Sequence, residues 1–92
     1  MATDWHTIGR VRNSTYREAT LLALEGKKTP AALHQQLPKI SRQHLSRSRR
    51  ELVKLKLVGC LTPKTPRYRL YQRITKGNQV ARAISRLSQR QS

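Results

Sequence analysis

Apolar residues recur at intervals of three and four along the first 57 residues, which is the spacing of amphipathic helices. The pattern predicts three helices, at about residues 14–25, 30–37 and 41–55. Each begins with a serine or threonine that can accept a hydrogen bond from the first helical turn. Pro38 ends the second helix, because the residue before a proline avoids helical backbone angles. A tight turn between the second and third helices predicts a helix-turn-helix.

After residue 57 the helical period gives way to short β-rich runs. The runs LVGCLT and RYRLYQ flank PKTP, whose prolines and lysine suit the tip of a two-stranded hairpin. From about Thr75 a helical period returns and ends in the polar run SQRQS, where we expect a ragged end. Three helices, a two-stranded wing and a C-terminal helix predict a mainly helical α+β fold, the winged helix-turn-helix.

These elements divide the chain into one domain with two short flanks. Residues 13–87 form the predicted winged helix-turn-helix domain, residues 1–12 an N-terminal extension and residues 88–92 a polar tail. The extension has a weak apolar pattern, so it could be a frayed start or a short element that folds back on the body. A chain of 92 residues leaves little room for a second module.

Composition adds a large excess of positive charge. Lysine and arginine number 20 against 4 acidic residues, which gives a formal net charge of +16. Self-repulsion on this scale predicts a polyanionic partner, with nucleic acid as the first candidate. An anionic membrane is disfavoured, because one Trp, three Tyr and no Phe provide few large apolar side chains for insertion. No apolar signal segment or membrane-spanning run occurs, so we expect a cytoplasmic, nucleoid-associated protein.

The positive charge is concentrated on one side of the predicted third helix, in the segment SRQHLSRSRREL and just beyond it. At 100° per residue one side carries Leu45, Ser48, Leu52 and Leu55. The opposite side carries Gln43, Arg47, Arg50 and Lys54. A helix that needs only solubility usually mixes charges of both signs, and here only Glu51 could do so. The stripe therefore predicts a partner that bears phosphates.

In a helix-turn-helix the second helix of the motif enters the major groove, and its first residues approach the base edges. The predicted DNA-binding residues of this helix are Arg42, Gln43, His44, Ser46, Arg47, Arg50 and Lys54. Arginine can bridge guanine O6 and N7, and glutamine suits adenine. We expect Arg50 and Lys54 to meet phosphates, whereas His44 could meet bases or phosphates. Arg49 falls at the margin of the apolar sector, where its stem could pack while its head reaches solvent or a partner.

In the wing, basic residues alternate with apolar ones along the second strand. The predicted DNA-binding residues here are Lys64, Arg67 and Arg69. Wings often lie along the phosphate backbone or over the minor groove, where arginine responds to groove width. Tyr68 and Tyr71 could stack on single strands, but a chain with few aromatic residues favours a role for them in the small core.

Several segments together resemble small archaeal winged helix-turn-helix transcriptional regulators, similar to the MarR and ArsR groups. The segments are VRNSTYREATLLALEGKKTPAAL, HLSRSRRELVKLKLVGCLTPKTPRYRLY and TKG, and the resemblance covers about residues 11–84. It implies DNA binding by the third helix and the wing. It also implies frequent homodimers through terminal helices, for which Ile84 and Leu87 could form a seam unless they pack against the first helix.

The sequence departs from this resemblance at three positions. Arg49 stands where relatives have an apolar residue, and Lys56 replaces the usual glycine before the first wing strand. Ile74 stands where a helix-capping threonine is expected, so that Thr75 could serve as the cap instead. Nothing resembles a pocket for a small-molecule effector.

The first functional hypothesis is a transcriptional regulator that binds double-stranded DNA. The alternatives are an abundant chromatin or architectural protein with little sequence preference and, third, an RNA- or ribosome-binding protein. We predict no enzymatic activity, because the acids Asp4, Glu18, Glu25 and Glu51 stand on separate elements. We predict no metal and no cofactor, because the three histidines have no metal-ligand spacing with the single cysteine, Cys60. Cys60 itself is expected to be a small buried residue at the start of a strand.

Overall fold

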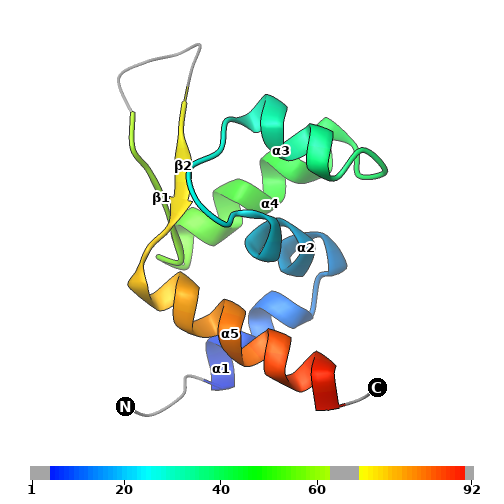
Figure 1. Ribbon diagram of the computed structural model, residues 1–92, viewed down its shortest axis with the longest axis vertical. Coiled ribbons are helices and arrows are strands. Elements are labelled where there is room, and N and C mark those ends of the chain that lie inside the picture. The colour runs from blue at the N-terminus through cyan, green and yellow to red at the C-terminus, as the bar shows by residue number, and fades with distance from the viewer. Residues whose placement is uncertain (1–4, 63–68, 91–92) are drawn as a thin grey trace.

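A computed structural model of the chain describes residues 5–62 and 69–90 (Figure 1). In order, these residues form α1 (Trp5–Arg12), α2 (Thr15–Ala23), α3 (Pro30–Gln36), α4 (Arg42–Lys54), β1 (Val58–Cys60), β2 (Tyr71–Arg73) and α5 (Thr75–Arg90). The two strands pair in an antiparallel sheet. The mainly helical fold with a two-stranded antiparallel sheet is therefore confirmed.

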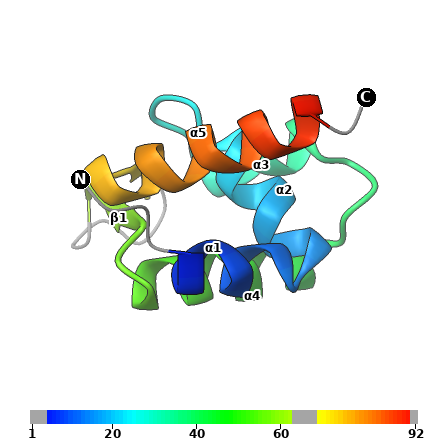
Figure 2. The same ribbon diagram turned by 90° about the horizontal axis from the view of Figure 1, so that it is seen from below.

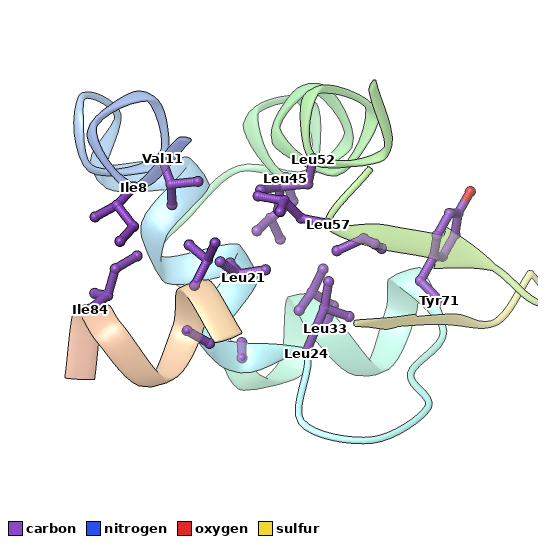
Figure 3. Close-up of a cluster of buried hydrophobic side chains, with 14 residues drawn as sticks. Ile8, Val11, Leu21, Leu24, Leu33, Leu45, Leu52, Leu57, Tyr71 and Ile84 are labelled. Carbon is purple, nitrogen blue, oxygen red and sulfur yellow. The ribbon is translucent and has the colours of Figure 1, made fainter. Parts of the chain in front are cut away.

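The helices lie in two layers around an apolar core. Figure 2 shows α1 and α4 on one side of the molecule and α5 on the other, with α2 running between them. In the close-up, side chains from both layers meet in the middle (Figure 3). The side chains buried most completely come from several elements: Val11, Leu21, Leu24, Leu33, Leu52, Leu57 and Ile84. Burial of this apolar surface is the main favourable contribution to folding.

The three predicted helix starts are confirmed by their caps. The side chains of Ser14, Thr29 and Ser41 each accept a hydrogen bond from the backbone N–H three residues later, at 3.1 to 3.3 Å. Each cap has extended backbone angles, as an N-cap requires. Pro30 occupies the first position of α3, where its missing N–H would have had no helical partner.

Residues 5–12 and 88–90 are more regular than the sequence pattern indicates. Residues 5–12 form a helix that folds back on the body, where Ile8 and Val11 are buried. Figure 3 shows Ile8 facing Ile84 of α5. At the other end, α5 continues to Arg90, into the segment expected to be ragged, since no Gly or Pro follows Gly77 to stop it.

The wing is anchored to the rest of the domain by backbone hydrogen bonds. β1 and β2 pair Val58 with Arg73 and Cys60 with Tyr71, and the backbone of Tyr71 also exchanges two bonds of 2.9 Å with Lys28, in the loop before α3. Cys60 is half-buried at the end of β1, so its expected place as a buried residue at the start of a strand is wrong. The predicted hairpin tip, residues 63–66, lies outside the described residues.

Lys56 adopts the left-handed backbone conformation that the missing glycine would have supplied. Its φ is 61°, and the turn after α4 has the two hydrogen bonds of a Schellman motif: Lys56 N–H to Val53 O and Leu57 N–H to Leu52 O, both 3.0 Å. A residue with a Cβ atom is strained in this conformation. The departure at Lys56 therefore costs stability.

We expect Lys56→Gly to increase the free energy of unfolding by about 1 kcal/mol, because glycine adopts this conformation without strain. Lys54→Gly, two residues earlier and within α4, should decrease it by about 0.5 to 1 kcal/mol. Urea unfolding of both variants provides the measurement. A loss of stability in both would contradict the assigned strain.

Gly77 lets α5 approach the wing closely. A Cβ atom placed on Gly77 would lie 1.9 Å from the carbonyl oxygen of Leu57, which itself accepts a hydrogen bond from Ile74 N–H. Ile74 also holds the N-cap position of α5, since its carbonyl oxygen accepts from Asn78 N–H. Thr75 is the first residue of the helix, so the expected cap at Thr75 is wrong.

Gly77→Ala should decrease the free energy of unfolding by more than about 2 kcal/mol, because backbone must move to admit the methyl group. Gly9 supplies the matched control, since a Cβ there meets nothing within 4 Å and the residue lies within α1. Gly9→Ala should stabilise by up to about 1 kcal/mol. Similar, small effects of both changes in chemical denaturation would show that the close approach is absent.

Candidate nucleic-acid interface

The outer side of α4 carries cations and no exposed acid. The structure leaves six of the seven residues proposed for this helix exposed, and Ser46 is half-buried: Arg42, Gln43, His44, Arg47, Arg50 and Lys54 are the exposed ones. The inner side of α4 packs into the core through Leu45, Ser48 and Leu52, while Leu55 is half-buried. Below, "the α4 face" means Arg42, Gln43, Arg47, Arg50 and Lys54.

Contacts with α2 hold the first turn of α4 in place. The Ser41 Oγ that caps the helix lies 2.9 Å from His44 Nδ1, and the His44 ring stacks on the ring of Tyr16 with centroids 4.4 Å apart. Such stacking adds about 0.5 to 1.5 kcal/mol beyond area burial. His44, predicted to contact DNA, thus also fixes α4 to α2.

An ion pair between Arg17 of α2 and Glu51 of α4 also connects these two helices. Arg17 Nη1 lies 3.2 Å from Glu51 Oε2, and the Arg17 side chain is 17 % exposed. The sequence pattern left Glu51 as the acid that could break the positive stripe on α4. In the structure its charge faces α2, so the α4 face keeps its single sign.

Arg49 connects α4 to the wing. Its guanidinium carbon lies 4.7 Å from the centre of the Tyr71 ring, and Tyr71 is buried in β2. Arginine is well suited to this geometry, because its flat head is weakly hydrated and stacks on aromatic rings. Tyr71 therefore packs within the protein, as favoured from the sequence, and is closed to a nucleobase.

A hollow of about 540 Å³ lies between α3 and the first half of α4. Arg42, Ser46 and Arg49 line it from α4, and Pro30 and His34 line it from α3. The hollow borders the residues proposed to approach base edges. Arg42, which belongs to the α4 face, and Arg49, which does not, therefore line the same concave surface.

Only part of the predicted wing site can be placed. Arg69 is exposed, just before β2, whereas Lys64, Arg67 and Tyr68 lie outside the described residues. Ile84 and Leu87, proposed for a dimer seam or for packing, differ in burial. Ile84 is fully buried in the core and Leu87 is half-buried against it.

Two further features of the described residues concern metal sites and membrane spans. In residues 5–62 and 69–90, no three His, Cys, Asp or Glu side chains come together as metal ligands. Within the same residues, none of the helices is both long and apolar enough to cross a membrane.

No protein-family profile matches the sequence, and no curated protein is significantly similar to it. Solved structures, in contrast, match the fold well. The transcriptional regulator YodB from B. subtilis, in its reduced form, superposes with a TM-score of 0.76 at 20 % identity, over 96 % of this chain and 88 % of YodB. The reduced form of MarR from E. coli gives a TM-score of 0.74 at 20 % identity, over 90 % of this chain and 62 % of MarR.

A third structure, a possible HxlR family transcriptional factor from Thermoplasma volcanium, gives a TM-score of 0.75 at 20 % identity, over 89 % of this chain and 75 % of that one. The chain has the winged-helix fold of these regulators. The expected likeness to the MarR group is confirmed at the level of the fold. The likeness to the ArsR group and to archaeal regulators in particular stays a prediction.

The pairing of Arg49 with Tyr71 should be measurable as a coupling in a double-mutant cycle. Arg49→Gln, Tyr71→Leu and the double variant should give a coupling energy of about 0.5 to 2 kcal/mol in urea unfolding, since the ring is buried and the guanidinium lies against it. Arg50→Gln with Tyr71→Leu is the control cycle, because Arg50 is exposed. Equal coupling in both cycles would contradict the contact.

Proposed function

We propose that the protein binds double-stranded DNA and regulates transcription, with α4 in the major groove and the wing against the backbone. The observation that carries this proposal is the α4 face: an exposed, single-sign side of the second helix of a helix-turn-helix. The similar fold of MarR, YodB and the HxlR-type factor supports it, since these are transcriptional regulators.

The positions along α4 suggest two kinds of contact. Arg42, Gln43 and Arg47 stand in the first half of the helix, where helix-turn-helix proteins reach base edges. Arg50 and Lys54 follow one and two turns later, where a helix leaving the groove meets phosphates. His44 and Ser46 would act mainly by holding this end of the helix, His44 through its stack on Tyr16.

Other activities have less support. The described acids lie apart or in ion pairs: Glu18 with Arg12 and Glu51 with Arg17. This arrangement favours a protein without enzymatic activity. A homodimer also stays a proposal, and Ile84 would not take part in it because the core of a single chain already buries this side chain.

Arg47→Ala should weaken binding to a selected duplex by about 1 to 3 kcal/mol and relax the base preference at one position. Lys54→Ala should weaken binding to all duplexes alike and make the slope of log K against log salt shallower by about 1. Titrations of a selected and a random duplex at several salt concentrations measure both effects. Equal losses on both duplexes from both variants would rule out base recognition by Arg47.

A further inference from the structure

The side of the molecule away from α4 carries a second group of cations. Arg82 and Arg86 are exposed on α5, and Arg73 of β2 lies half-buried next to them. Together they line a hollow of about 650 Å³, with Glu25, two residues after the end of α2, as the acid in its lining. Below, "the α5 face" means Arg73, Arg82 and Arg86.

The charges of the α5 face are not balanced by the part of the chain that the structure describes. Neither Arg82 nor Arg86 forms an ion pair within residues 5–62 and 69–90. The guanidinium groups of Arg82 and Arg86 are exposed, so they are open to charge-assisted hydrogen bonds from an anionic partner.

The helices that carry the two cationic faces lie on opposite sides of the molecule. Figure 1 looks down the shortest axis of the molecule, about 19 Å thick, with α5 in front of α1 and the α4 layer behind. The view from below separates α4 and α5 to opposite edges, and α2 lies between them (Figure 2). A duplex docked on the outer side of α4 therefore has α2 and the core between it and α5.

Taken together, these observations lead us to propose that the α5 face binds the phosphate backbone of a second duplex, so that one chain bridges two DNA segments. This inference rests on the proposed DNA binding by α4. Arg82 and Arg86 are four residues apart, about 6 Å along the helix axis, and so form a row that suits the repeated charges of a strand. Only seven of the 20 cations belong to the α4 and wing sites predicted from the sequence, which leaves ample charge for a second contact.

The number of duplexes bound per chain tests the proposal. A duplex of about 15 base pairs is far shorter than the persistence length of about 150 base pairs, so it cannot bend around one chain to reach both faces. With this duplex in excess at low salt, sedimentation should show one chain carrying two duplexes. Three phosphate contacts predict a salt slope of about −2.7 for the second duplex, a loss of about 40-fold in affinity between 50 and 200 mM salt.

Two double variants with the same loss of charge test whether the second duplex binds at the α5 face. Arg82→Gln with Arg86→Gln should bind one duplex per chain with the first-site affinity unchanged. Arg10→Gln with Lys39→Gln removes the same charge from exposed positions outside both faces and should still bind two. All four positions are exposed, and thermal unfolding of each double variant checks that the fold is retained.

Other outcomes overturn the proposal in distinguishable ways. Saturation of the unmodified chain at one duplex overturns the second site and leaves DNA binding by α4 intact. Loss of the second duplex from both double variants alike would mean that net charge, not the α5 face, governs it. A complex of two chains with two duplexes would assign bridging to a dimer.

If inorganic phosphate shifts the NMR signals of Arg82 and Arg86 while only one duplex binds, the site takes a small anion instead. Absence of any complex with DNA overturns the proposed function itself.

Discussion

The apolar core between the two helical layers is what allows so cationic a chain to fold. With 20 basic and 4 acidic residues, most surface charges repel one another, and the described ion pairs engage only Glu18 and Glu51. Leucines from α2, α3 and α4, with Ile84 from α5, are almost completely buried in the core. The free energy gained by burying them offsets this repulsion. Because the core holds the helices, exposed cations such as Arg47, Arg50 and Arg82 can remain on the surface without forming ion pairs among the described residues.

The same packing determines which side of α4 is exposed to solvent. The apolar side of α4 packs inward, so the cations of the α4 face form a continuous exposed surface. The acid Glu51 forms an ion pair with Arg17 of α2 instead of neutralising this surface. His44 on Tyr16 and Arg49 on Tyr71 fix the two halves of α4 to α2 and to the wing. A rigidly held helix meets a groove with less loss of conformational freedom than a mobile one would.

Much of the fold could be predicted because it depends on local signals. Ser14, Thr29 and Ser41 cap helices by contacts three residues away, and the period of the leucines shows which side is buried. The helix at residues 5–12 cannot be predicted from the sequence, because its apolar pattern is weak and its burial depends on α5, which is distant in sequence. Contacts such as Arg17 with Glu51 and Arg49 with Tyr71 join residues 34 and 22 positions apart, and no periodicity indicates them. The grouping of Arg82 and Arg86 with Arg73 arises only when α5 packs beside β2, so the helical period does not indicate it.

We propose that the outer side of α4 is where this chain meets DNA. Titration of the isotopically labelled protein with one equivalent of duplex, followed by NMR of backbone amides and arginine side chains, tests it residue by residue. We expect the largest shifts at Arg42, Gln43, Arg47 and Arg50, with little change in the buried Leu52 and Ile84. Shifts absent from α4, or confined to α1 and the chain ends, would contradict it.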